Sequence, residues 1–99
     1  MITFVNLFQV RGSVEEFERV FAETSEFMAA QQGFRQHTLA RNIEEDKADC
    51  YVNIAHWRDA ECLRRAIAHP DFLAHAEQIR ALSTSTANLY VPRQSRSER

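Results

Sequence analysis

Glycine and proline are scarce in this chain, with two residues of each among 99. Such a composition disfavours a fold made of many short strands and tight turns, and it favours long regular elements. Apolar runs long enough to cross a bilayer are also lacking, and the first residues carry neither the charged nor the apolar region of a signal peptide. We therefore expect a cytoplasmic protein without a membrane partner.

The chain also has few cysteines and a small net charge. Cys50 and Cys62 stand 12 residues apart and form no CxxC pair, which predicts two reduced thiols. The net charge is -2, from 12 basic and 14 acidic side chains, and no basic block precedes the last few residues. Nucleic acid is therefore not an expected partner. With 44% hydrophobic residues, the chain suits one domain with a small core.

The segment 50–57 has the alternation of a β-strand. Val52 and Ile54 fall on one face. The other face carries Tyr51, Asn53, Ala55 and Trp57. Asn53 and Trp57 lie roughly 13 Å apart on such a strand, and both side chains donate hydrogen bonds. Donors on a face that turns toward the core either pair internally or bind a ligand, and the pattern leaves both readings open.

Caps and periodicity predict the other elements. Ser13 and Glu16 form a capping box, Gly33 suits a left-handed residue after a helix, and Asp59 suits an N-cap. The patterns predict strands at 2–10, 34–42 and 83–91 and helices at 14–31, 60–68 and 70–81. This order is the split βαβ pattern of a ferredoxin-like α+β fold, with a four-stranded antiparallel sheet and helices on one face.

Residues 1–92 form the predicted domain, and residues 93–99 form a predicted disordered tail. The sheet face without helices carries Val5, Leu7, Val52 and Ile54. Exposure of these apolar side chains to water is unfavourable, so we expect a homodimer in which a second subunit packs sheet against sheet.

The helix-covered face carries polar groups among aromatic ones. Phe4, Asn6 and Phe8 share a face of the first strand, which neighbours the third strand in this topology. Asn6 and Asn53 are then expected to lie close together under the helices, ringed by Phe4, Phe27, Trp57 and Phe72, with Tyr51 at the rim. An apolar cavity with a few convergent donors is the usual form of a small-molecule site.

The four histidines do not indicate a metal site, because they form no HxxxH pair and no set with Cys or Glu. We expect His37 to be exposed on the second strand, His56 to face the dimer partner or the sheet edge, and His69 to cap a helix. His75, on the last helix, is a candidate for reaching the cavity. A nucleophile elbow, a glycine-rich phosphate loop and a carboxylate pair are all lacking, which argues against hydrolases, kinases and glycosidases.

The chain resembles the antibiotic biosynthesis monooxygenase superfamily, whose members are small dimeric α+β barrels. The resemblance covers almost all of residues 2–92. It rests on the first strand from Ile2 to Asn6, on Gly33-Phe34 after the first helix, on the strand from Tyr51 to Trp57, and on the segment His69 to Phe72.

The resemblance implies a cofactor-free oxygenase that uses O₂ to oxidise a phenolic, anthrone-like intermediate of aromatic polyketide biosynthesis. It implies catalytic roles for Asn53 and Trp57, and we add Asn6, which we expect to orient the ring. The expected substrate contacts are Phe4, Phe27, Tyr51, Phe72 and His75. The alternatives are a non-oxidative cyclase or ligand-binding accessory protein that uses the same cavity, a haem-binding or haem-degrading protein, and a purely structural dimer with a filled core.

Haem-degrading relatives resemble the chain at Asn6 but carry two further residues. They have a second Trp in the helix after the strand, where this chain has Ala66, and a haem-ligating His one residue away from the place of His75. The resemblance therefore favours the oxygenase over the haem enzymes.

Overall fold

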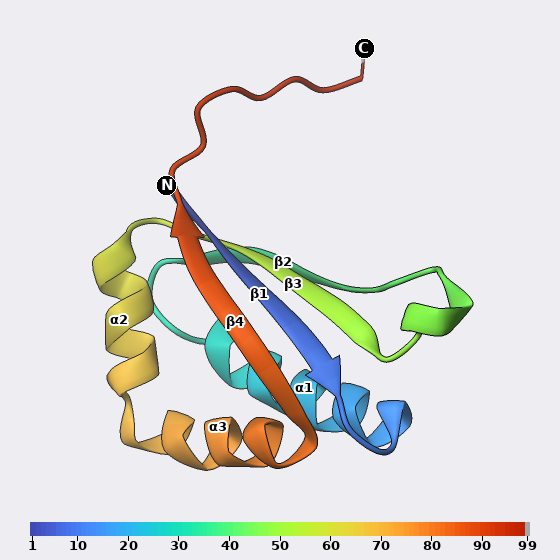
Figure 1. Ribbon diagram of the computed structural model, residues 1–99. Coiled ribbons are helices and arrows are strands. Elements are labelled where there is room, and N and C mark those ends of the chain that lie inside the picture. Colours follow the sequence, from blue (N-terminus) through green and yellow to red (C-terminus); the bar gives the residue numbers. More distant parts are fainter. Residues whose placement is uncertain (99) are drawn as a thin grey trace.

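The chain folds as a four-stranded antiparallel sheet with α-helices on one side (Figure 1). The computed structural model describes residues 1–98, so Arg99 of the predicted tail lies outside the described residues. The elements are β1 (Ile2–Val10), α1 (Val14–Ala29), β2 (Phe34–Arg41), the 3-10 turn η1 (Glu45–Lys47), β3 (Cys50–Trp57), α2 (Ala60–Ala68), α3 (Pro70–Leu82) and β4 (Ser83–Tyr90). The predicted ferredoxin-like α+β fold is confirmed.

The strand order is β2-β3-β1-β4, which places β1 and β3 in the middle of the sheet, as predicted. Residues 91–98 follow β4 without helix or strand, and the disorder predicted there stays a prediction. No helix within residues 1–98 combines the length and apolar character needed to span a bilayer.

Side-chain caps begin all three α-helices. Ser13 Oγ accepts a hydrogen bond from the Glu16 N–H at 3.1 Å, while the Glu16 carboxylate pairs with Arg19 rather than completing the predicted capping box. Asp59 Oδ1 accepts from the Cys62 N–H at 2.8 Å, and this bond is the main cause that lowers the pKa of Asp59 to about 2. His69 caps α3 by accepting from the Asp71 N–H. The local sequence thus fixes where each helix starts.

Gly33 links the end of α1 to the start of β2 in a space that only glycine fits. Its φ is +88°, in the left-handed region. A Cβ at this position would lie 2.5 Å from the Cβ of Cys62, so α2 approaches the backbone closely here. The Arg58 N–H donates to the Gly33 carbonyl at 2.7 Å. These contacts bring the start of β2 against the end of β3, where Phe34 meets Trp57.

The hydrophobic core consists of two clusters. The first contains Phe8, Val10, Phe17, Val20, Phe21, Tyr51 and Ile79. The second contains Ala55, Trp57, Cys62, Leu63 and Ala66. Both lie on the helix side of the sheet, which confirms the predicted orientation of Tyr51, Ala55 and Trp57.

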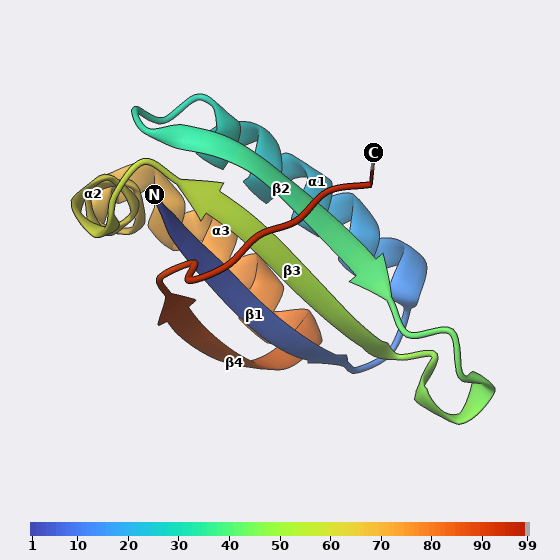
Figure 2. The same cartoon turned by 90° about the horizontal axis from the view of Figure 1, so that it is seen from above.

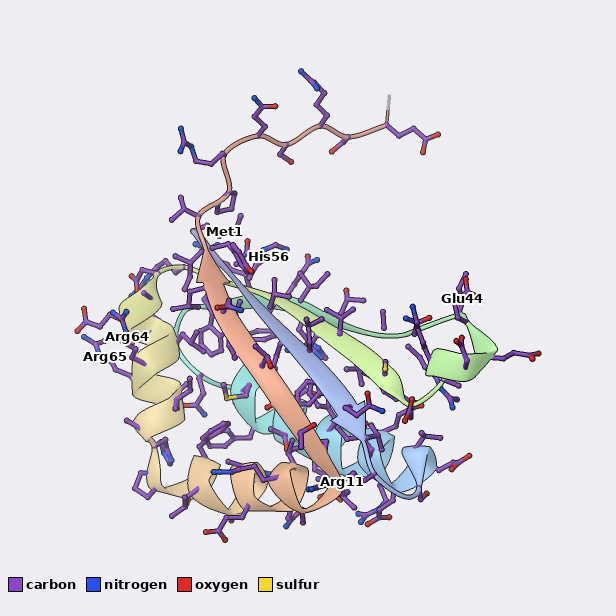
Figure 3. All side chains as sticks on the ribbon, in the orientation of Figure 1. Met1, Arg11, Glu44, His56, Arg64 and Arg65 are labelled. Carbon is purple, nitrogen blue, oxygen red and sulfur yellow. The ribbon has the colours of Figure 1, made fainter. Side chains whose placement is uncertain are left out.

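The other face of the sheet carries no helix (Figure 2). Leu7 is 55% exposed and Ile54 is 39% exposed on it, while Val5 and Val52 are half-buried. His56 lies on this side too, away from α1 and α3 (Figure 3), and its Nδ1 is 3.2 Å from Thr3 Oγ1. The predicted open face therefore exists, and a single chain leaves its apolar side chains in water.

Candidate active site

A cavity of about 340 Å³ lies between the sheet and the helices. Members of both core clusters line it, among them Phe8 and Phe21 from the first and Trp57 and Leu63 from the second. The volume is within the range of small-molecule pockets. Both core clusters thus border the cavity.

Asn6 and Asn53 form the polar centre of this cavity. They are direct partners in the antiparallel β1–β3 pairing, so their side chains project from neighbouring positions of the same face. Both line the cavity. The amide oxygen of Asn6 is buried and has no hydrogen-bond partner among residues 1–98. An unpaired buried acceptor costs about 1–3 kcal/mol, which is tolerated where a ligand or water completes the site.

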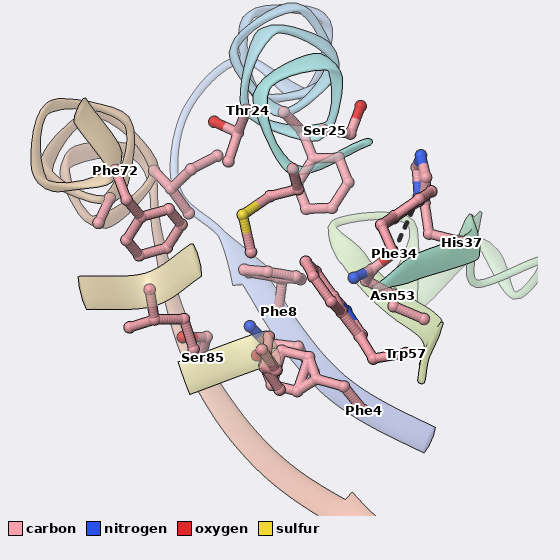
Figure 4. A pocket seen from close by; sticks show the side chains of 18 of the residues that line it. Phe4, Phe8, Thr24, Ser25, Phe34, His37, Asn53, Trp57, Phe72 and Ser85 are labelled. Atoms are coloured by element: carbon pink, nitrogen blue, oxygen red, sulfur yellow. Dashed lines mark hydrogen bonds between the residues drawn. The ribbon is translucent and has the colours of Figure 1, made fainter. Parts of the chain in front are cut away.

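Asn53 has a partner that the sequence pattern did not predict. The distance from its Oδ1 to Nδ1 of His37 is 3.2 Å, and Figure 4 shows the two side chains joined by this contact. Because an amide oxygen only accepts, His37 Nδ1 carries the proton and donates it. The NH₂ group of Asn53 remains available as a donor. The expectation that His37 is exposed was wrong: His37 is half-buried and lines the cavity.

The reason for this error lies in a β-bulge at the start of β2. Phe34 pairs with Trp57, yet Gln36 already pairs with His56, so Arg35 is an extra residue. Simple alternation from Phe34 would put Gln36 on the cavity side and His37 on the open side. The bulge reverses this parity, and His37 comes to the cavity side with Phe34.

Trp57 forms one wall of the cavity. It is 1% exposed, and its ring stands edge-on to Phe34 with 5.4 Å between centroids. Figure 4 shows Trp57 beside Asn53, with Phe4 and Phe8 also bordering the cavity. The predicted grouping of Asn6, Asn53 and Trp57 around one hollow is therefore what the structure has.

Two of the five predicted substrate contacts line the cavity, and three do not. Phe4 and Phe72 are lining residues. Phe27 is outside the lining; its ring contacts those of His69 and His75 at centroid distances of 5.2 and 5.4 Å. His75 does not line the cavity either, and its Nδ1 is buried without a partner among residues 1–98.

Tyr51 also lies outside the cavity lining, although it shares the strand face of Asn53. Its ring packs on Phe17 at 5.0 Å, and its hydroxyl donates to Glu18 Oε2 at 2.5 Å. Burial, followed by the hydrogen bond to Glu18, raises the pKa of Tyr51 to about 12. Tyr51 is thus a core residue with a paired hydroxyl, and its expected substrate contact is not supported.

The helices also contribute residues to the cavity lining, and sequence periodicity did not distinguish them from residues of the hydrophobic core. These include Phe21, Thr24, Ser25 and Met28 from α1 and Ala76, Ile79 and Arg80 from α3. Their three- and four-residue spacing is that of any buried helix face, so no signal in the sequence marks them as cavity residues. Arg80 is the one permanently charged side chain of the lining, and no carboxylate lines the cavity. The described residues place no carboxylate within ion-pair distance of Arg80.

Outside the cavity, Cys50 and Cys62 are unpaired thiols, in agreement with the sequence. Within residues 1–98, no three His, Cys, Asp or Glu side chains gather in a cluster of the kind that holds a metal ion.

Comparison with known proteins gives consistent matches. The family model described as antibiotic biosynthesis monooxygenase matches residues 1–78. The chain is 55% identical over 93 residues to deoxynogalonate monooxygenase of Streptomyces nogalater, covering 94% of this chain and 77% of that protein. The crystal structure of SnoaB, a cofactor-independent oxygenase from Streptomyces nogalater, is 54% identical with a TM-score of 0.91, covering 98% of this chain and 97% of that one. A structure of an asparagine-to-alanine variant of SnoaB matches with the same TM-score and coverage at 52% identity.

Proposed function

Because this chain belongs to the antibiotic biosynthesis monooxygenase family and is a cofactor-independent oxygenase, we propose that it oxidises a phenolic, polycyclic aromatic compound with O₂. The proposed reaction converts an anthrone-like methylene to a carbonyl group in aromatic polyketide biosynthesis. The largely aromatic and aliphatic lining of the cavity supports a hydrophobic ring system as the substrate.

The observation that carries the proposal is the pair of amides at the centre of an apolar cavity. Asn6 and Asn53 are cross-strand partners, and the unpaired oxygen of Asn6 leaves a polar position for a bound molecule to fill. A purely structural core would pair or exclude these groups. A molecule that carries oxygen atoms on a flat apolar body fits both properties of the site.

The chemistry proceeds with the substrate and O₂ alone. Loss of a proton from the methylene gives an electron-rich anion, which transfers one electron to O₂ and yields a substrate radical and superoxide. Their combination forms a carbon–oxygen bond, and protonation gives a hydroperoxide. Loss of the second methylene proton with cleavage of the O–O bond then leaves the carbonyl group and releases water.

The protein's part is to stabilise the anion and the peroxide and to exclude water. We propose that the NH₂ group of Asn53 and the indole N–H of Trp57 donate to substrate oxygens and to the peroxide, and that Asn6 orients the ring. Phe4 and Phe72 supply apolar walls. A donor of this kind in a dry site contributes roughly 3 kcal/mol to the stabilisation of an oxyanion.

Arg80 adds a positive charge to the lining. We assign it to the attraction of an anionic substrate, because the lining contains no carboxylate that would neutralise its guanidinium group. Arg80 is an exposed residue, so its charge acts through solvent as a screened attraction for the ionised form of a phenol or of a carboxyl substituent.

We also propose that the protein is a homodimer in the cytoplasm. The open face of the sheet exposes Leu7 and Ile54, and a second copy packed sheet against sheet would cover them. The two unpaired cysteines fit a reducing compartment.

The test is an oxygen-electrode assay with an anthrone under air and under nitrogen. We expect O₂ uptake that falls by roughly 100-fold in Asn53→Ala and Trp57→Phe, while Asn42→Ala, at the exposed β2–β3 connection, retains full activity. Full activity in both cavity variants would remove these side chains from the mechanism. Turnover under nitrogen would instead indicate a cyclase, and binding of an aromatic ligand without turnover would indicate an accessory protein.

A further inference from the structure

We infer that His37 is a positioning residue, which holds the amide of Asn53 with its NH₂ group toward the cavity. This inference rests on the proposed role of Asn53 as a donor to the substrate. It adds a third side chain to the polar centre, from a strand that neither Asn6 nor Asn53 belongs to.

The sheet brings the two side chains together from adjacent strands. His37 is paired with Ala55, and the cross-strand partner of Asn53 is Leu39. His37 therefore lies diagonally across from Asn53 on the same face, a separation that an imidazole bridges. The resulting distance from Nδ1 to Oδ1 is 3.2 Å. Without the extra residue at the bulge, His37 would point to the open face and this contact would not form.

Aromatic neighbours hold the imidazole in place. The ring of Phe21 from α1 lies 6.0 Å from that of His37, and the ring of Phe34 lies 6.2 Å from it. His37 is half-buried between them. A hydrogen bond in such an apolar setting is stronger than one in water, so the contact is able to select one orientation of the amide.

The orientation of the Asn53 amide matters for the reaction because its oxygen accepts hydrogen bonds and its NH₂ group donates them. A carboxamide rotated by half a turn has nearly the same shape, but it presents an acceptor where it had presented a donor. An acceptor turned toward a developing anion is repulsive. The Nδ1–H of His37 fixes the Asn53 oxygen on its own side and leaves the NH₂ group for the substrate (Figure 4).

The same bond defines what a positioning role needs. His37 acts on the amide of Asn53 as a hydrogen-bond donor from Nδ1, and the lone pair of Nε2 takes no part in this contact. A positioning role therefore requires only a donor at this place and not an imidazole.

Two variants at His37 test the inference. His37→Leu removes the donor, and His37→Asn places an amide N–H near the former position of Nδ1. We expect kcat to fall by roughly 10- to 100-fold in His37→Leu with KM changed less than about three-fold, and we expect His37→Asn to recover most of the loss. Gln36→Leu, on the same strand but on the open face, is the matched control for folding and is expected to behave as wild type.

A double-mutant cycle decides whether the effect passes through Asn53. In the Asn53→Ala background, His37→Leu is expected to cause no further loss of kcat, because the group that it positions is gone. Additive losses, full activity in His37→Leu, or failure of His37→Asn to recover activity would each overturn the inference.

A readout without turnover distinguishes failure of this inference from failure of the proposed function. The side-chain NH₂ signals of Asn53 in a ¹⁵N NMR spectrum are expected to shift in His37→Leu and to stay near their wild-type positions in His37→Asn. If no aromatic substrate reacts with the wild-type protein, the proposed function fails while this measurement still tests the contact. If the Asn53 signals do not respond to His37→Leu, the contact itself is refuted.

Discussion

Asn6 and Asn53 face each other across the two central strands, yet they differ in how their amide oxygens are satisfied. The oxygen of Asn53 accepts from His37, whereas that of Asn6 is buried without a partner among residues 1–98. Stability alone would not retain such an unpaired group, because an apolar side chain of similar size avoids the desolvation cost. The difference identifies Asn6 as the position where function and stability conflict.

Replacement of Asn6 by leucine is therefore expected to stabilise the folded protein and to lower its enzymatic activity. Removal of the unpaired oxygen should raise the free energy of unfolding by about 1 kcal/mol, while turnover of an aromatic substrate falls at least roughly 10-fold. Urea unfolding and O₂ uptake measure the two effects. Asn53→Leu is the matched comparison: it breaks the bond to His37, so it should lose activity without gaining stability. A destabilised Asn6→Leu protein would contradict our reading of the site.

The cavity itself is tested by filling it. Ala76 on α3 lines the cavity, and Ala74 on the same helix is exposed. Ala76→Leu adds apolar atoms to the hollow, so we expect KM for an aromatic substrate to rise at least roughly 10-fold while the free energy of unfolding stays level or rises by about 1 kcal/mol. Ala74→Leu should change neither quantity. Equal KM values for the two variants would mean that substrate does not bind in this cavity.

The contribution of Arg80 to substrate binding is expected to be electrostatic, so it should depend on ionic strength. Arg80→Gln is expected to raise KM for an anionic substrate by roughly three- to ten-fold, and the wild-type KM should rise toward that of the variant as ionic strength increases. Arg64→Gln is the control, because Arg64 is exposed like Arg80 but lies on α2 and does not line the cavity (Figure 3). A salt dependence that persists unchanged in Arg80→Gln would assign the attraction to another charge.

The sequence predicted most of this fold because its local signals and its long-range pattern agree. The alternation of residues 50–57 placed Asn53 and Trp57 on the helix side, and pairing of the central strands then brought Asn6 to Asn53. Four side chains were misplaced, for separate reasons. A bulge reversed the face of His37, whereas Tyr51 shares the correct face but lies beyond the end of the cavity. Phe27 on α1 and His75 on α3 pack on each other outside the cavity lining, and helical spacing alone does not say which neighbour a ring contacts.

The homodimer is tested on the open face of the sheet. Leu7 is more than half exposed on β1, and a glutamate there would place a charge between two packed sheets. We expect Leu7→Glu to run as a monomer in light-scattering chromatography at a concentration where the wild-type protein is a dimer. Glu44→Ala, in the exposed β2–β3 connection, should leave the mass unchanged. A monomeric wild-type protein would refute the proposed assembly.

Titration of Tyr51 makes the free energy of unfolding depend on pH. This dependence allows its structural role to be tested separately from a catalytic one. Burial and the bond to Glu18 raise its pKa from 10.0 to about 12, so the folded protein holds the phenolic proton more tightly than the unfolded chain does. The stabilisation is therefore complete below pH 10 and is lost as pH rises from 10 through 12, by at most about 3 kcal/mol. Urea unfolding at several pH values measures this loss. Tyr51→Phe keeps the ring on Phe17 and removes the hydroxyl, so its stability should lack this alkaline decline while its kcat/KM at neutral pH stays at the wild-type value. A large loss of activity in Tyr51→Phe would return Tyr51 to the substrate site, where its sequence position had first suggested it.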